Sequence, residues 1–144
     1  ILVEEFLQGK EVSVCIIGRG DNTPLFLPME LYLEEDEAFL QHNLYTNHVK
    51  INSQTSYRDV HIRDEDMLSL RKLFSSLGKI DYMRIDGKVD DGVFRLIELT
   101  PDAYIGPSSV VTHAASTLGF DYQQTLMLII NTALIHYQNR GSNE

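Results

Sequence analysis

The first part of the chain contains short runs of aliphatic and β-branched side chains, a pattern that predicts strands. Residues 2–7 and 11–17 are two such runs, and Gly9 between them is a turn signal, so they predict a hairpin. A further strand is predicted over residues 25–27, which lie between two prolines. The chain is therefore expected to begin with β-structure.

The next stretch, residues 29–62, follows neither the helical nor the strand period for long, and the acidic run 34–37 lies near its start. A connection of that length in a compact domain usually carries a function or moves. The alternative is an ordinary surface excursion with minor strands. The pattern of residues does not choose between these two interpretations.

The middle of the chain gives clearer signals. Residues 64–77 place apolar side chains on one stripe, begin with acidic residues and are followed by Gly78, which predicts a helix. Residues 80–86 and 93–99 read as two strands joined by a polar turn that contains Asp-Gly, which predicts a hairpin.

Two helices are expected to close the chain. Ser108 is expected to cap the first, and Asp121 and Gln124 have the spacing of a capping box for the second. The predicted apolar face of the last helix consists of Leu126, Ile129, Ile130, Ala133, Leu134 and Tyr137. The prediction is an α+β fold, with helices packed on one side of a mainly antiparallel sheet.

Composition narrows the class of partner. The chain has 144 residues, 43% of them hydrophobic, which is enough for one core and one domain. Its net charge of -9 argues against nucleic acid and anionic membrane surfaces as partners, and no apolar stretch is long enough to span a bilayer. The single cysteine, Cys15, excludes an internal disulfide and favours a reducing, cytoplasmic compartment.

The chain begins at Ile1 rather than at an initiator methionine, and no signal peptide follows. We therefore expect it to be part of a longer protein.

The most informative group of residues is Arg84 and Asp86 on one predicted strand and Glu98 near the end of its partner. Alternate strand residues share a face, so Arg84 and Asp86 point the same way, and a register that opposes Asp86 to Glu98 would bring all three together. Two close carboxylates repel each other unless a cation lies between them, and magnesium prefers such oxygen ligands. Arg84 would then hold a phosphate oxygen. The alternative is a solvated sheet face with an Arg-Asp pair.

Two segments carry a resemblance to a known family. The run MRIDGKVDDGVFRLIELTP resembles the region of D-alanine–D-alanine ligases, members of the ATP-grasp superfamily, where an Arg-x-Asp strand precedes a Glu-x-Asn strand end. The start, VEEFLQGKEVSV, resembles the hinge segment of that family. The order of these segments and the two closing helices also fit. The resemblance implies that residues 1–144 are the carboxyl-terminal part of an ATP-grasp domain, without its amino-terminal and central subdomains.

The resemblance implies ATP and Mg²⁺ as cofactors and assigns roles on the nucleotide side. Glu4, Phe6 and Leu7 would line the adenine pocket, and Glu11 would accept hydrogen bonds from the ribose hydroxyls. Lys50 would face the terminal phosphate. Without the resemblance, the acids read as exposed strand positions and the lysine as a solvated loop residue.

On the reacting side, the resemblance implies that Asp86 and Glu98 hold magnesium and that Arg84 stabilises the acyl phosphate and the tetrahedral intermediate. Ser109 would contact a substrate carboxylate.

The chain departs from the family on the amino-acid side of this site. Thr100 stands where the family has the metal-binding asparagine, and Asp102 is the expected substitute ligand. Tyr104 stands where the family tends to have a glycine, and it is expected to narrow the acceptor side of the cleft.

These features predict part of an ATP-dependent ligase that joins a small carboxylate to an amine through an acyl phosphate. Its expected partners are ATP, those substrates and the upstream part of its own chain, and a homodimer is compatible with the sequence. Two alternatives remain. One is a non-catalytic ATP-grasp-like module that binds a nucleotide or a partner, and the other is an unrelated α+β interaction domain whose acidic run is a solvated face.

Overall fold

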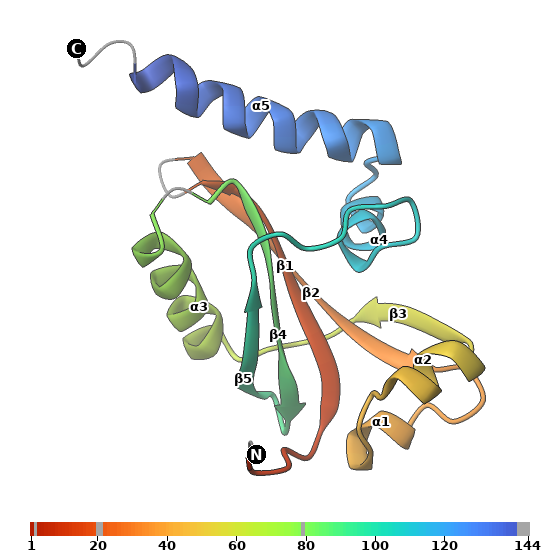
Figure 1. The fold of residues 1–144 in the computed structure, drawn as a ribbon. Coiled ribbons are helices and arrows are strands. Elements are labelled where there is room, and N and C mark those ends of the chain that lie inside the picture. The colour runs from red at the N-terminus through yellow and green to blue at the C-terminus, as the bar shows by residue number, and fades with distance from the viewer. Residues whose placement is uncertain (2, 20–21, 79, 141–144) are drawn as a thin grey trace.

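A five-stranded antiparallel sheet organises the protein, as seen in a computed structural model that describes residues 1, 3–19, 22–78 and 80–140 (Figure 1). The strands are β1 (Lys10–Arg19), β2 (Asn22–Leu33), β3 (Thr55–Asp59), β4 (Tyr82–Asp90) and β5 (Val93–Thr100). Their order in the sheet is β3-β2-β1-β4-β5, and every neighbouring pair is antiparallel. β1 is therefore the central strand.

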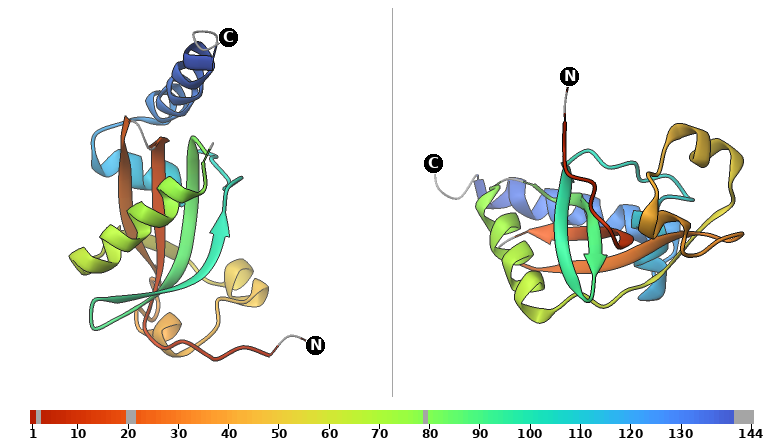
Figure 2. Two further views of the ribbon diagram at one scale, coloured as in Figure 1. Left: turned by 90° about the vertical axis from the view of Figure 1, so that its left-hand side faces the viewer. Right: turned by 90° about the horizontal axis from the view of Figure 1, so that it is seen from below.

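Helices cover both faces of this sheet, as the two views of Figure 2 show. They are α1 (Phe39–His42), α2 (Asn47–Asn52), α3 (Asp64–Ser76), α4 (Val110–Thr117) and α5 (Tyr122–Arg140). No helix within the described part of the chain is long and apolar enough to cross a membrane.

The two faces have separate cores because successive strand residues point to opposite sides. Val14 and Ile16 of β1 pack in one core with Phe74 of α3, on what we call the α3 face. Cys15 and Ile17 pack in another core with residues of α4 and α5, on what we call the α4 face. The α+β class predicted from the sequence is confirmed. The detail that the helices pack on one side is wrong, since a central strand that is apolar on both faces needs cover on both.

The helix and the hairpin in the middle of the chain are confirmed. α3 begins at Asp64 and carries three acidic residues in its first turn, where they complement the helix dipole. β4 and β5 form the hairpin, and its turn residues Asp91 and Gly92 have φ values of 49° and 77°. Asp and Gly are the residues that tolerate this left-handed conformation most readily.

The hairpin predicted at the start of the chain is wrong. Residues 3–8 form no strand, and β1 pairs with β2 and β4 instead. Residues 14–18 of β1 are all buried, so this strand needs a partner on each side and a helix on each face. Glu4 and Glu5 are exposed and would not suit a buried partner strand. The strand predicted over residues 25–27 forms the middle of the longer β2.

The stretch from residue 29 to 62 is ordered as the end of β2, two short helices and β3. Leu31, Leu33 and Leu40 form a small core beneath α1 and α2. The acidic run connects the start of this excursion to its end by hydrogen bonds. Glu34, Glu35 and Glu37 accept hydrogen bonds from Ser56, the Gln54 amide and Arg58, respectively.

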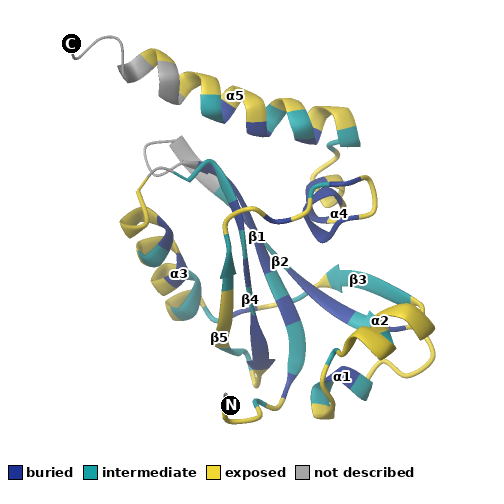
Figure 3. Ribbon diagram, in the orientation of Figure 1, coloured by how far each residue is buried: buried dark blue, intermediate teal, exposed yellow. Residues whose placement is uncertain are grey.

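The closing helices differ from the prediction in detail. Ser109, not Ser108, caps α4, whereas the capping box of Asp121 and Gln124 is confirmed, with both N–H···O distances at 2.8 Å. The buried stripe of α5 passes through Thr125, Ile129 and Thr132, and Figure 3 shows the outer side of this helix exposed. The two threonines tolerate burial because each donates its hydroxyl proton to the carbonyl four residues earlier. Two residues of the predicted apolar face, Ile130 and Leu134, are instead about half exposed, and the side chain of Tyr137 lies outside the described residues.

Candidate functional site

The β4–β5 ladder places the predicted acids directly opposite each other. Arg84 is opposite Thr100 and Asp86 is opposite Glu98, but the next pair is Gly87 with Leu96. β5 therefore carries one extra residue, Ile97, in a β-bulge. Arg84, Asp86, Glu98 and Thr100 all belong to the α4 face of the sheet, as do the odd-numbered residues of β1.

The carboxylate of Asp86 is the centre of a hydrogen-bond network. Its Oδ1 accepts from Ser13 Oγ at 2.7 Å and from Arg84 Nε at 2.8 Å. Its Oδ2 lies 2.9 Å from the same Arg84 Nε and 3.4 Å from Thr100 Oγ1. The Asp86 side chain is 15% exposed, so these contacts fix its orientation while leaving it within reach of a ligand. Ser13 is a member of the site that the sequence analysis missed, since the register of β1 against β4 was unknown.

The charges of this network favour an ionised pair. Burial alone would lower the pKa of the Arg84 guanidinium, but the hydrogen bond and the negative charge of Asp86 outweigh it, so this pKa lies above its ordinary value. Cys15 is opposite Arg84 in the β1–β4 ladder and is fully buried, and burial raises the pKa of its thiol far above the ordinary value despite the opposing charge of Arg84. The cysteine is therefore an inert core residue.

Glu98 is exposed, and it adds to the electrostatic stabilisation of Arg84. The oxygen atoms that could bind a metal here belong to the carboxylates of Asp86 and Glu98 and to the hydroxyl of Thr100. This set fits magnesium, which takes hard oxygen ligands and binds through one or two carboxylates together with water and phosphates. Within the described residues no three His, Cys, Asp or Glu side chains gather closely enough to hold a metal. The role of Asp102 as a substitute ligand therefore stays a prediction.

The other residues predicted on the substrate side follow β5. Asp102 is exposed in the turn after the strand, and Tyr104 is 67% exposed, with its ring folded over Gly106. Ser109 is buried, and its Oγ accepts from the Thr112 amide at 3.1 Å. The Thr112 hydroxyl donates to the Gly106 carbonyl, so in its 3.1 Å contact with Ser109 Oγ the serine must be the donor. The cap therefore uses the only proton of this serine.

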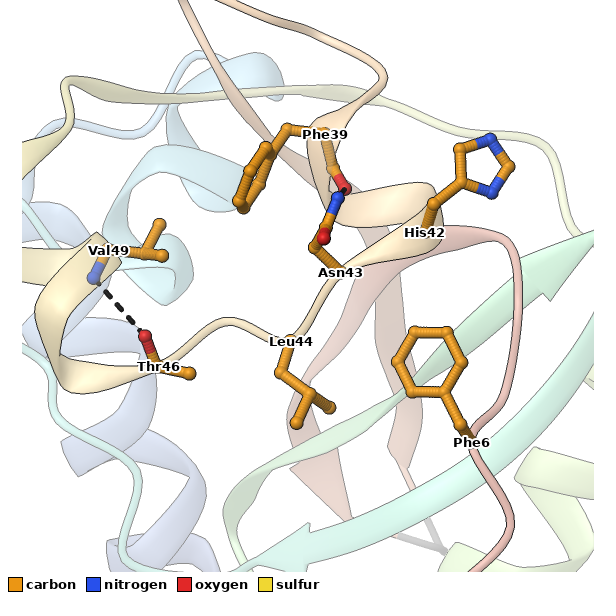
Figure 4. Close-up of a pocket in the computed structure, with 7 residues that line it drawn as sticks. All are labelled: Phe6, Phe39, His42, Asn43, Leu44, Thr46 and Val49. Carbon is orange, nitrogen blue, oxygen red and sulfur yellow. Dashed lines mark hydrogen bonds between the residues drawn. The ribbon is translucent and has the colours of Figure 1, made fainter.

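On the nucleotide side, Phe6 lines a pocket of about 440 Å³ (Figure 4). The remaining lining residues, all from the excursion between β2 and β3, are Phe39, His42, Asn43, Leu44, Thr46 and Val49. His42 also hydrogen-bonds Gln8, at 2.8 Å. Glu4 is exposed and Leu7 is half-buried, and neither lines this pocket. The sequence analysis missed its wall because the excursion showed no periodic pattern.

Glu11 and Lys50, the other two predicted nucleotide residues, differ in their surroundings. Glu11 lies on the α4 face of β1, and its Oε2 is 2.8 Å from the ammonium group of the buried Lys88. Lys50 is exposed on α2, and its ammonium lies 5.0 Å from the centre of the Tyr45 ring. The structure therefore connects Glu11 to the strand that carries Asp86, and places Lys50 on the excursion beside β3 (Figure 1).

A second pocket, of about 420 Å³, lies between β3 and α4 and includes Tyr57, Ser108 and His113 in its lining. The Tyr57 and His113 rings are 5.4 Å apart. Burial raises the pKa of the Tyr57 hydroxyl, and the charges of Arg84 and Asp86 act on it in opposite directions. Tyr57 therefore lies within electrostatic range of Arg84 and Asp86.

Comparison with known proteins finds relatives that match nearly the whole chain. A D-alanine–D-alanine ligase of Fervidobacterium nodosum is 28% identical over 134 residues, which are 92% of this chain and 42% of the relative. The chain is similar to D-alanine–D-alanine ligases over nearly its whole length. A ligase of the same name from Flavobacterium psychrophilum is 28% identical over 137 residues, 93% of this chain and 40% of the relative. No family model matches the chain.

Solved structures of these ligases share the fold. The Bacillus anthracis D-alanine–D-alanine ligase, in a complex with ATP, matches 95% of this chain and 42% of its own, with a TM-score of 0.60 and 20% identity. The Coxiella burnetii enzyme matches 96% of this chain and 36% of its own, with a TM-score of 0.64 and 15% identity. The resemblance and the ATP-grasp fold predicted from the sequence are thus confirmed. The chain spans about two fifths of the length of the D-alanine–D-alanine ligases it matches.

Proposed function

We propose that this chain is the carboxyl-terminal part of a magnesium-dependent ligase that uses ATP to join a small carboxylate to an amine through an acyl phosphate. The observation that carries the proposal is the Arg84–Asp86 pair, set opposite Glu98 and Thr100 on one face of the sheet. Similarity to D-alanine–D-alanine ligases supports it. The remaining walls of the site would come from the rest of the protein, and such an enzyme would work in the cytoplasm, where ATP is supplied.

Such a reaction depends on placement and on neutralising the charge of the transferring phosphoryl group. Asp86 and Glu98 would hold magnesium, which when bound would draw charge from the phosphate oxygens. Arg84 stays protonated in its ion pair, so it offers a fixed positive charge to the acyl phosphate and to the oxyanion that follows. Ser13 would keep the Asp86 carboxylate in its orientation.

The sheet also suggests where the nucleotide would lie. Next to Asp86 on the α4 face come Lys88 and Glu11, and Lys88 contacts the carbonyl of Leu40 in α1. α1 also contributes Phe39 and His42 to the pocket that Phe6 lines. We infer that the phosphates lie at Asp86, the ribose at Glu11 and the base in this pocket. Lys50, beside Tyr45, would reach the terminal phosphate once the excursion closes over it.

Calorimetric titration of ATP into the complete protein, with and without magnesium, tests the metal assignment. Asp86→Asn combined with Glu98→Gln should abolish magnesium-dependent binding and leave the circular dichroism spectrum unchanged. Asp59→Asn combined with Asp90→Asn also removes two negative charges from exposed positions and should bind as the wild type does. An unchanged titration in the first double variant would exclude the metal assignment.

The chain alone is expected to release no phosphate and to bind nucleotide weakly at best, because a site with one wall leaves the phosphates in water, where charge interactions are weak. Phosphate release by these 144 residues that depends on an amino-acid substrate would contradict this expectation.

A second candidate is a non-catalytic module that binds a nucleotide or a partner. Thr100 favours this candidate for two reasons. Its hydroxyl already donates to Asp86, and its side chain is shorter than that of the family's asparagine. Tyr104, in place of a glycine, also favours it. Formation of an amide product by the complete protein would decide for the ligase, and ATP binding without any product would decide for the module.

A further inference from the structure

Lys88 is a buried lysine in the middle of the candidate site. Its side chain is only 4% exposed, and it lies on the same face of β4 as Arg84 and Asp86. Lysine is rarely buried to this degree unless its charge is paired. Here the ammonium bonds to Glu11 Oε2, at 2.8 Å, and donates to the backbone carbonyl of Leu40. Its position in the strand gave no sign of this role.

The Glu11–Lys88 pair is the next pair of the β1–β4 ladder on the same face as the Ser13–Asp86 pair. Both pairs are directly opposed residues of β1 and β4. The two pairs are separated by two residues, or about 7 Å along the strand. That spacing suits one nucleotide whose phosphates lie at the first pair and whose ribose lies at the second.

The geometry also decides which part of Glu11 is left for a ligand. The buried Lys88 ammonium lies 2.8 Å from Oε2 of Glu11. The Glu11 side chain is 22% exposed, so part of it is open to solvent. The printed contact of this ion pair is at Oε2, so Oε1 is the oxygen that we assign to a ligand. A carboxylate held at one oxygen loses less rotamer freedom when the other oxygen accepts a hydroxyl proton.

We propose that Lys88 is a positioning residue for ribose recognition: it fixes Glu11 so that the second carboxylate oxygen faces the ribose hydroxyls. The inference rests on the proposed function, since it needs a nucleotide at this face. Through Leu40, Lys88 also ties α1, and with it the wall of the Phe6 pocket, to the strand that carries Asp86. Ribose recognition and the base pocket therefore depend on one side chain.

The test compares ATP with 2′-deoxy-ATP and 3′-deoxy-ATP by calorimetric titration, with magnesium, into the complete protein. A hydroxyl bonded to a carboxylate should give wild type a preference for ATP of about tenfold or more. Lys88→Met should lose this preference to the same extent as Glu11→Gln, and the double variant should lose no more than either. Lys10→Met breaks an ion pair to a buried glutamate on the opposite face of β1, and should keep the preference.

The outcomes separate the two levels of inference. If wild type binds no ATP, the proposed function fails. If wild type binds ATP but does not prefer it to the deoxy analogues, or if Lys88→Met weakens all three nucleotides equally, Lys88 is structural only and the positioning role fails. Should Lys88→Met not fold, Lys88→Gln keeps a hydrogen-bond donor without the charge. It should lose at least part of the preference, and a full preference in this variant would overturn the proposal.

Discussion

Phe94 and Glu98, four residues apart on β5, face opposite sides of the sheet. In a regular strand residues four apart share a face, so the bulge at Ile97 causes the reversal. Phe94 packs against the core on the α3 face, and Glu98 stands opposite Asp86 on the α4 face. Because of the extra residue Ile97, β5 contributes Phe94 to the core on one face and Glu98 to the polar site on the other.

Gly87→Ala should disturb this arrangement. A Cβ at Gly87 would lie 2.4 Å from the carbonyl oxygen of Arg95 and 2.5 Å from the Phe94 ring, so β5 would have to move. We expect a loss of about 1–3 kcal/mol in the free energy of unfolding, measured by urea denaturation.

Gly78→Ala is the matched control for this prediction. A Cβ there meets nothing within 4 Å, but φ is +80°, so the cost should be about 1 kcal/mol from backbone strain alone. In the complete protein, Gly87→Ala should also weaken magnesium-dependent ATP binding, and Gly78→Ala should not. Equal effects of the two variants on binding would show that the bulge does not position Glu98.

The parts of the fold that the sequence predicted are those with local signals. The Asp-Gly turn, the acidic start of α3 and the Asp121–Gln124 box each act within a few residues. The order of the strands could not be predicted in this way, because β1 pairs with strands on both sides and its five apolar residues fit several partners. The hairpin expected at the start failed for this reason.

The same division holds for the site. Arg84, Asp86 and Glu98 were predicted because they share a hairpin, whose register depends on one short turn. Ser13 and Lys88 were missed, since each enters the site only through the pairing of β1 with β4, which joins residues more than 70 positions apart. Contacts of that separation leave no periodic signal in a single sequence.

Ser13→Ala should loosen the Asp86 carboxylate. It removes the 2.7 Å hydrogen bond to Oδ1 and leaves Arg84 as the main partner. We expect a loss of about 1 kcal/mol in the free energy of unfolding and a several-fold weaker affinity for MgATP in the complete protein. Ser69→Ala, which removes a hydroxyl that only bonds its own helix backbone, is the control and should leave MgATP affinity unchanged. If Ser13→Ala and Ser69→Ala bind MgATP equally well, Ser13 does not position Asp86.

Asp102→Ala should leave the magnesium dependence of ATP binding unchanged. Asp102 lies exposed in the turn after β5, and the described residues hold no cluster of three acids that includes it. The measurement is the ATP affinity of the complete protein across a magnesium titration, next to that of Glu98→Gln. A shift of the Asp102→Ala curve toward that of Glu98→Gln would restore Asp102 as a metal ligand.

The last prediction concerns the pH dependence of stability, and its origin is Glu30, which is 1% exposed on the α3 face of β2. Burial alone would raise the pKa of Glu30, but its bonds to Arg58 and Lys10 outweigh burial and hold this pKa below the ordinary value of 4.5. A carboxyl whose pKa is lowered by folding stabilises the fold above its unfolded pKa, and this contribution is lost as the pH falls through the folded pKa.

Glu30→Gln should therefore cost about 3 kcal/mol at pH 7, because it leaves two cations around a buried neutral group. The difference from wild type should narrow as the pH falls below 4.5, the ordinary pKa, since the wild-type carboxyl is then protonated as well. Glu37 is the other partner of Arg58, and its side chain is 60% exposed. Glu37→Gln should therefore cost less than about 1 kcal/mol. Urea denaturation at several pH values between neutral and strongly acidic measures all three proteins. A difference between Glu30→Gln and wild type that stays constant over this range would mean that the ion pair does not supply the stability, and that the loss arises from packing.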